Sequence, residues 1–410
     1  MFAMPKTGLL ARLRVFFNTP KGTRTSLWLT YFIYWAGAAS FLPYISVYYE
    51  SVDLKGTQIG QLNSIPFFIS LISSVGFAFL SDVSKQHKTV MRLCALGLIA
   101  VMAVFPGANS FVTFLPIVLV WSLINAPFNA IMDETTLTTL ENPADYGSIR
   151  VGGSIGWGIM VLVVGFVIDH ARMGLPIIFY IQIFFLILFL INTFTLPNAH
   201  KPAPGTEQHA SLSMIWNMLR LPGFLPFLLM IIVWGMGEAA IGSFLFLHIK
   251  SLGGSSTLMG TALAVSLIGE IVTFSVSNKI QARIGPHKMM LLSFLVLFAW
   301  LFGLSLIRNP NAIPLFQIFG GAGFALMQSG SVAYVNARAP KELGATSQAI
   351  RGGIISGFGT GIGTLISGIL YETSGSVFLF RTMAYLVIAG FVLGMFLYFT
   401  NHRKNDPFRA

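Results

Sequence analysis

The amino-acid sequence predicts an all-α membrane protein with twelve transmembrane helices in two pseudo-symmetric six-helix halves. Of its 410 residues, 55% are hydrophobic and only 10% are charged, whereas a soluble globular protein carries about 25% charged residues. The apolar residues gather in twelve long runs that short polar connections separate. A charged, glycine-rich segment also occurs twice, about 200 residues apart. The low charge, the apolar runs and the internal repeat together predict a duplicated bundle of membrane spans.

Each apolar run is long enough to cross a membrane as a helix, because about 20 residues span roughly 30 Å of hydrocarbon. Helices are expected because backbone polar groups in lipid must find their hydrogen-bond partners within the segment. The predicted spans are 25–48, 59–80, 89–107, 111–133, 147–169, 174–196, 223–247, 256–278, 289–307, 312–336, 347–371 and 376–400.

Lysine and arginine are concentrated in the N-terminal tail and in alternate connections. Such residues flank the cytoplasmic ends of spans, so both termini are predicted to be cytoplasmic, in the cell inner (plasma) membrane. This distribution explains the net charge of +11 without a nucleic-acid partner. The tail at 1–24 has no recognisable signal-peptide core. Cys94 is the single cysteine, which excludes a disulfide framework and a cysteine metal site; no cofactor or metal is predicted.

The longest polar connection divides the chain after six spans. It predicts an N-terminal half at 1–196, a cytoplasmic linker with a short amphipathic segment at 197–222, and a C-terminal half at 223–410. Two repeats support this division: Tyr146–Gly158 resembles Gln348–Gly359, and the loop at Ser81–Lys88 resembles Ser277–Lys288. Two six-helix repeats are a known construction of secondary transporters.

The whole chain resembles the major facilitator superfamily. The loop Ser81–Lys88 is similar to that superfamily's signature between spans 2 and 3, with Asp82 as its acid. Within the superfamily, the chain resembles the branch of lactose permease, nucleoside symporters and phenylpropionate permeases. The residues that carry this second resemblance are FLPYISVYY (Phe41–Tyr49), DYGSIRVGGSIGWG (Asp145–Gly158), Gly269-Glu270 and Ser277-Asn278-Lys279. The resemblance implies a transporter fold, and it leaves the substrate open.

Span 4 carries polar side chains at every fourth position, which places them on one face of a helix. They are Trp121, Asn125, Asn129 and Asp133. Polar residues inside a span usually face the bundle interior or a water-filled cavity, so this stripe is predicted to line a central cavity and to contact substrate. The alternative is that Asn125 only satisfies backbone groups freed by Pro127, and that Asp133 marks the inner end of the span.

A second candidate site combines an acid of span 4, Asp133 or Glu134, with Arg150 and Trp157 of span 5. The acid and Arg150 are expected at similar depth, where a carboxylate and a guanidinium group hold a solute hydroxyl through charge-assisted hydrogen bonds. The resemblance to lactose permease implies sugar-binding roles for the acid, Arg150 and Trp157. The alternative places Arg150 at the cytoplasmic interface, where it pairs as a gate or extends to water. For Trp157 the alternative is core packing.

Glu238 in span 7 and Glu270 in span 8 are acids inside apolar runs. A charge at such a position costs roughly 2.5–3.5 kcal/mol on insertion scales, a cost that is rarely carried without function. Both are predicted to carry the coupling proton, and Glu270 is also predicted to bind substrate. The alternative is a buried structural ion pair, for which Arg351 is the candidate partner.

Span 10 departs from lactose permease, whose span 10 supplies a His and a Glu for proton coupling. The run Phe319–Val335 has neither residue type, Gly320 and Gly323 fill the corresponding positions, and Gln328 is the largest polar group nearby. Coupling, if present, therefore depends on Glu238 or Glu270. Residues at the inner face are predicted to gate the transporter, with plain positive-inside charge as the alternative for the loop. These gating residues are Asp82, Lys85, Lys88 and Arg351.

The predicted function is import of a small organic solute by alternating access, with proton symport and with a sugar or nucleoside as the favoured substrate. Alternatives are a permease for an aromatic or other organic acid, an uncoupled facilitator, and a non-transporting membrane sensor on a transporter fold. No catalytic constellation emerges, so an enzyme is not predicted. The expected partners are the solute, protons and the lipid bilayer, with the chain as a monomer.

Overall fold

The computed structural model describes residues 19–84, 87–140, 142, 145–170, 173–196, 223–338 and 344–402. Within these ranges it leaves out the side chains of 71–84, 87, 127, 129–130, 344–346, 349 and 400–402. The predicted linker at 197–222 lies outside the described residues.

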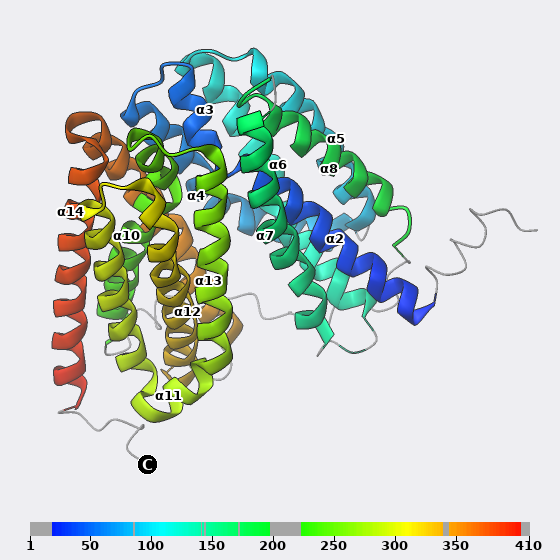
Figure 1. Cartoon of the computed structure of the whole chain (residues 1–410). Helices are drawn as coiled ribbons and strands as arrows, with labels where there is room; N and C mark the ends of the chain where they lie inside the picture. The colour runs from blue at the N-terminus through cyan, green and yellow to red at the C-terminus, as the bar shows by residue number, and fades with distance from the viewer. Residues whose placement is uncertain are drawn as a thin grey trace, which may run out of the picture.

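Throughout the described ranges, all regular elements are helices (Figure 1). The first group comprises α2 (Pro20–Phe41), α3 (Ile45–Ser51), α4 (Gly56–Ser84), α5 (His87–Val104), α6 (Phe111–Thr139), α7 (Tyr146–His170) and α8 (Ile177–Asn192). The second group comprises α10 (Phe224–Ser251), α11 (Ser256–Leu306), α12 (Ile313–Arg338), α13 (Gly344–Gly353), the π-helix η5 (Ile354–Gly359) and α14 (Thr360–His402). The 3₁₀ turns η1 (Phe105–Gly107) and η3 (Pro310–Ala312) precede α6 and α12.

Local sequence signals set where several helices begin. The side chain of Thr19 accepts a hydrogen bond from the backbone N–H of Gly22 at 3.1 Å, and Pro20 occupies the first helical position of α2. Ser255 accepts from the N–H of Leu258 at 3.2 Å in the same way at α11. Such caps satisfy backbone donors that have no partner inside the helix.

Two of the long helices are interrupted by a glycine in the left-handed region. Gly285 in α11 has φ 79° and Gly375 in α14 has φ 76°, and both residues interrupt the helical geometry. Only glycine adopts such values without a steric penalty. The breaks fall in the connections predicted at 279–288 and 372–375. By contrast, predicted span 1 (25–48) is divided, because α2 ends at Phe41 and α3 begins at Ile45.

Seven helices among the described residues are long and apolar enough to cross a membrane. They are 88–107, 111–139, 146–170, 224–251, 256–306, 310–338 and 350–399. Two of these, with 51 and 50 residues, are each about 75 Å long at 1.5 Å per residue. That length exceeds twice the roughly 30 Å of a hydrocarbon core, and each contains one of the glycine breaks.

The helices pack into an N-terminal bundle, α2 to α8, and a C-terminal bundle, α10 to α14. In the first, α2 packs on α7 and α8, and α6 packs on α4 and α5; in the second, α10 packs on α14 and η5, and α11 on α12. The bundles meet chiefly where α7 packs on α11 and where α4 packs on α14. Figure 1 shows the bundles side by side, converging toward the upper edge of the view and diverging toward the lower.

The two glycine-rich segments occupy comparable places in their bundles. A Cβ atom added to Gly156 of α7 would lie 2.4 Å from the carbonyl oxygen of Phe32 in α2. One added to Gly359 of η5 would lie 2.9 Å from the carbonyl oxygen of Ile232 in α10. In both cases glycine allows the segment to approach the first long helix of its own bundle.

Candidate functional site

Two neighbouring cavities lie in the interior of the helix assembly. The carboxylate cavity, of about 270 Å³, is bounded by α7, α10, α11 and α12. The interface cavity, of about 560 Å³, is bounded by helices of both bundles, among them α2, α4, α6, α10 and η5. Glu238, Gly242 and Phe324 line both cavities, so the side chain of Glu238 stands where the two adjoin.

The carboxylate cavity brings together three predicted site residues. Glu238 lies at the middle of α10, Glu270 lies at the middle of the part of α11 before Gly285, and Trp157 reaches the cavity from α7. Neither carboxylate has a hydrogen-bond or ion-pair partner among the described residues, so the structural ion pair with Arg351 is absent there.

Gln317 and Trp300 also line the carboxylate cavity, and sequence reasoning did not select them. Gln317 is 0% exposed, and neither its amide nitrogen nor its amide oxygen has a hydrogen-bond partner. The indole Nε1 of Trp300 is likewise buried without a partner. A signal was present for Gln317, which is a polar residue inside the apolar run 312–336. From the sequence, Gln328 was singled out in this run instead of Gln317. In the structure, Gln328 accepts a hydrogen bond from Arg351 at 3.2 Å.

The residues of the polar stripe predicted on span 4 do not all lie at one cavity. Trp121 and Asn125 line the interface cavity, where the amide oxygen of Asn125 accepts from the hydroxyl of Tyr34 at 3.1 Å. The side chain of Asn129 lies outside the described residues. Asp133 lines neither cavity, because it lies farther along α6 and accepts a hydrogen bond from the hydroxyl of Tyr31 at 2.5 Å.

Asp133 and Arg150 do not form an ion pair, because each is hydrogen-bonded to a tyrosine instead. The guanidinium of Arg150 donates to the hydroxyl of Tyr146 at 3.0 Å. The rings of Tyr31 and Tyr146 meet edge to face, with 6.3 Å between centroids. Arg150 is exposed, Glu134 is half-buried, and neither lines a described cavity. The charged groups predicted to hold solute are thus linked through two phenols at a distance from Trp157's cavity.

The interface cavity is lined in part by the π-helix η5. Ser356 of η5 and Thr360 at the start of α14 both reach it. The hydroxyl of Thr360 donates to the carbonyl oxygen of Ile355 at 3.1 Å, across the wider turn. Single π-turns are frequent at functional sites. This element was missed because the glycines of span 11 indicate close helix packing but carry no signal for a change of helical pitch.

Two of the predicted gating residues, Lys88 and Arg351, have partners within their own bundles. Lys88 donates to the carbonyl oxygen of Leu196 at 2.6 Å. Arg351 is buried and donates to Gln348 at 2.8 Å and to Ser331 at 3.1 Å. The side chain of Asp82 and the whole of Lys85 lie outside the described residues.

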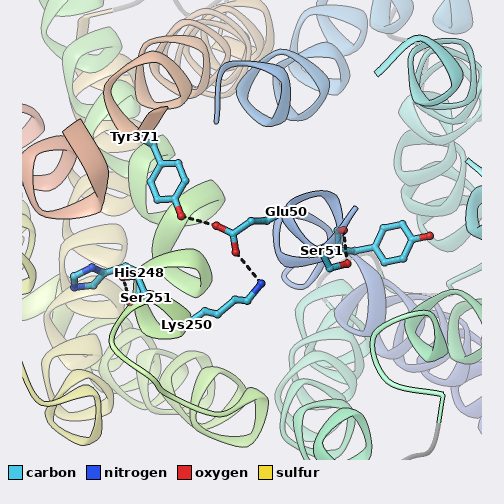
Figure 2. Close-up of polar contacts among 7 residues, drawn as sticks. Glu50, Ser51, His248, Lys250, Ser251 and Tyr371 are labelled. Atoms are coloured by element: carbon cyan, nitrogen blue, oxygen red, sulfur yellow. Dashed lines mark hydrogen bonds and ion pairs between the residues drawn. The ribbon is translucent and has the colours of Figure 1, made fainter. Parts of the chain in front are cut away.

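A polar cluster at the other end of the helices joins the two bundles (Figure 2). The ammonium of Lys250, at the end of α10, lies 2.8 Å from one carboxylate oxygen of Glu50 in α3. The hydroxyl of Tyr371 donates to the second oxygen of Glu50 at 2.6 Å. One acid of the N-terminal bundle thereby holds two helices of the C-terminal bundle.

Two further carboxylates cap helices of the opposite bundle. Asp169, near the end of α7, accepts from the backbone N–H groups of Ser256 at 3.0 Å and Thr257 at 2.8 Å, at the start of α11. Glu372 of α14 accepts from the backbone N–H of Thr57 at 2.8 Å, at the start of α4. The positive end of a helix favours a negative charge at this position. We call these contacts the crossed caps.

Glycines allow close helix approach beside each crossed cap. A Cβ atom on Gly165 of α7 would lie 2.4 Å from the carbonyl oxygen of Ser256. One on Gly368 of α14 would lie 2.6 Å from the carbonyl oxygen of Gly56. Asp169 and Glu372 differ by 203 residues, and Thr57 and Thr257 by 200, so the two caps occupy matching places in the internal repeat.

Comparison with known proteins agrees with this architecture. The MFS_1 like family matches residues 24–382. The maltose permease of Geobacillus stearothermophilus is 26% identical over 88% of this chain and 91% of the relative. The probable 3-phenylpropionic acid transporter of Escherichia coli strain K12 is 24% identical over 86% of this chain and 93% of the relative.

Solved structures share the fold. The crystal structure of the nucleoside transporter NupG superposes with a TM-score of 0.77, at 17% identity, over 94% of this chain and all of that one. A bacterial homologue of the human lysosomal transporter Spinster, in an inward-facing conformation, gives a TM-score of 0.66 at 13% identity. The relatives are transporters rather than enzymes. Since the family match extends over most of its length, the chain belongs to the MFS_1 like family and is a multi-pass membrane transporter of the major facilitator superfamily.

Proposed function

We propose that this protein imports a small, uncharged organic solute by alternating access and that Glu238 and Glu270 couple the import to protons. The observation that carries the proposal is the pair of unpartnered carboxylates that share one cavity with Trp157 at the middle of the helices. A proton on one carboxylate removes the repulsion between two like charges in a poorly solvated space. Solute binding that changes this space would then bind or release a proton.

The lining of the cavities favours a neutral solute over an organic acid. Among the described residues that line the carboxylate cavity and the interface cavity, there is no lysine, arginine or histidine. Arg150 and Arg351, the predicted ligands for a solute carboxylate, line neither. An anion would meet Glu238 without a compensating cation, and an unpaired charge is costly to desolvate. A sugar or nucleoside suits an indole, amides and carboxylates better, as the maltose permease relative would suggest.

We further propose twelve membrane crossings in two six-helix halves, with the linker at 197–222 and both termini in the cytoplasm. The breaks at Gly285 and Gly375 support this count, because each divides a helix of more than twice the membrane thickness. In that orientation, the crossed caps and the cluster of Glu50, Lys250 and Tyr371 close the outer end. The conformation then corresponds to the inward-facing state of an alternating-access cycle.

Transport by the purified protein in proteoliposomes tests the proposal. Maltose, uridine and 3-phenylpropionate represent the three solute classes, and internal pH is followed with a trapped dye. We expect uptake of a neutral solute with proton entry, and accumulation when the outside is acidic. Uptake without proton movement would instead indicate a facilitator, and uptake of 3-phenylpropionate alone would establish the acid permease. Absence of uptake in every class would favour the sensor.

A further inference from the structure

The carboxylate cavity contains hydrogen-bonding groups that the protein itself leaves unsatisfied. Gln317 presents an amide nitrogen and an amide oxygen, and Trp300 presents an indole N–H, all buried and without a partner. Buried polar groups in native structures are nearly always hydrogen-bonded, so each exception calls for an explanation. The mechanism of proton coupling uses the two carboxylates and gives these groups no role.

Close packing of α11 and α12 holds both side chains in place. A Cβ atom on Gly321 would lie 1.9 Å from the carbonyl oxygen of Ser266 in α11. One on Gly320 would lie 2.4 Å from the indole ring of Trp300. The glycines therefore let α12 touch the backbone of α11 and let the indole lie across α12. Gln317 lies one turn earlier on α12, beside this contact.

We propose that Gln317 and Trp300 form a neutral subsite that selects a hydroxyl-bearing solute. The amide oxygen accepts a hydrogen bond from a solute hydroxyl, the amide nitrogen donates to a solute oxygen, and the indole N–H donates to another. This inference rests on the proposed transport function and names the chemical feature of the solute that the site recognises, its hydroxyl groups. Gln317 and Trp300 are the residues that determine specificity.

The chemistry of the groups decides the solute class. An amide both donates and accepts, whereas an indole only donates. A hydroxyl group also does both, so a polyol or a ribose satisfies the amide and the indole together. An apolar solute would leave them unpaired. A carboxylate would satisfy the indole but would lie beside Glu238 and Glu270, whose charges repel it.

The first test compares Gln317→Leu and Trp300→Phe with the wild-type protein for binding of neutral saccharides and nucleosides, led by maltose and uridine. Gln317→Leu keeps the approximate shape, Trp300→Phe keeps an aromatic ring but shortens the side chain, and both remove hydrogen-bonding groups. We expect the dissociation constant to rise about tenfold for either variant, the usual effect of losing hydrogen bonds in a site that reads them. The matched control is Gln182→Leu in α8, a buried glutamine that lines neither cavity and should bind as the wild type does.

Deoxy analogues distinguish direct contact from distortion of the site. If Gln317 binds a hydroxyl of uridine, removal of that hydroxyl weakens binding to the wild type but not to Gln317→Leu. The combined loss of binding free energy is then smaller than the sum of the two separate losses, as it is for groups that interact directly. Fully additive losses for every deoxy position of every bound solute, or unchanged binding in Gln317→Leu, would overturn the inference.

Thermal unfolding without solute supplies a readout that needs no ligand. Because Gln317 has unsatisfied groups in the empty cavity, Gln317→Leu should raise the unfolding temperature, as is common when a functional residue is replaced. A fall in the unfolding temperature would assign Gln317 a structural role and contradict the proposal. If the wild type binds 3-phenylpropionate and no neutral solute, the subsite is refuted while transport stands. If it carries no solute at all, the transport function itself fails.

Discussion

At the residue scale, Glu238 and Glu270 differ from the other carboxylates described above, because neither has a hydrogen-bond or ion-pair partner among the described residues. Asp169, Glu372 and Glu50 each accept hydrogen bonds from the opposite bundle, and Asp133 accepts one from Tyr31. The two cavity acids have only each other. These contacts mark Asp169, Glu372 and Glu50 as acids that join the two bundles, and they leave Glu238 and Glu270 available for the proposed binding of protons or solute.

Replacing either cavity acid by glutamine should uncouple transport. In Glu238→Gln and Glu270→Gln the solute is expected to equilibrate across the membrane without accumulating, because the remaining carboxylate has no like charge beside it whose repulsion a proton would relieve. Uptake under an imposed pH gradient, compared with exchange at equal pH, measures the difference. Asp53→Asn serves as control, because Asp53 is exposed and has φ 61°, a conformation that asparagine tolerates. Accumulation by both glutamine variants at the wild-type level would refute the coupling role.

Filling Gly242 should block the site without harming the fold. Gly242 lines both cavities, and a Cβ atom there would meet nothing within 4 Å. We expect Gly242→Leu to weaken solute binding more than roughly tenfold, since its side chain occupies the cavity, while helix stability rises by up to about 1 kcal/mol. Binding and thermal unfolding measure the two effects. Gly147→Leu, at an open position of α7, is the control that should retain binding.

A side chain that crowds the contact between α11 and α12 should destabilise the fold. Gly320→Ala places a methyl group against the indole of Trp300, and such overpacking costs about 1–3 kcal/mol. Thermal unfolding should therefore occur at a lower temperature, and the fluorescence of Trp300 should shift as the indole moves. An unchanged unfolding temperature and spectrum would mean that Trp300 is free to relocate, which would weaken the argument for a rigid subsite.

Much of the site could be predicted from sequence, and the reasons for the failures are physical. Glu238, Glu270 and Trp157 stand out because a charge or an indole inside an apolar run is visible without a structure. Trp300 was not selected, because its missing partner is a property of the tertiary structure. The proximity of Asp133 and Arg150 was inferred from their expected depth and from the resemblance to lactose permease, and neither of these reveals Tyr31 and Tyr146 beside them.

At the element scale, the starts and ends of helices determine how the bundles join. The crossed caps connect carboxylates to helix N-termini that are 87 and 315 residues away in sequence, so no local pattern could reveal them. The apolar runs predicted most helices, whereas the division between α2 and α3 and the π-turn of η5 escaped prediction. Hydrophobicity indicates where a helix lies, but it does not indicate whether the hydrogen bonds are those of an α-helix or of a π-helix.

Removing a crossed cap should favour the state in which this end of the transporter is open. A capping carboxylate contributes about 1 kcal/mol, which is roughly a fivefold change in a two-state ratio. We expect Asp169→Ala and Glu372→Ala each to increase the rate at which an impermeant reagent labels a cysteine at Ser266, in a Cys94→Ser background. The double variant should show the product of the two effects. Asp145→Ala, which removes the ion pair with Arg24 inside one bundle, should leave the rate unchanged.

At the scale of the whole molecule, each bundle has its own packing contacts and meets its neighbour mainly through two helix pairs. We therefore expect residues 1–196 and 223–410, expressed as two chains, to assemble into a working transporter. Co-purification and solute uptake measure the result. A cut at 53–54, inside the N-terminal bundle, is the comparison that should fail. Loss of assembly after the first cut alone would contradict the division into halves at 197–222.

The crossed caps have a consequence for the history of the chain. The end of α7 meets the start of α11 as the part of α14 before Gly375 meets the start of α4, with matching acids, glycines and backbone donors. Reciprocal contacts of this type join two identical subunits about a two-fold axis. We infer that an ancestral chain corresponding to one bundle dimerised through this patch before duplication and fusion. The contact at this end of the helices is then a former subunit interface, retained within a single polypeptide.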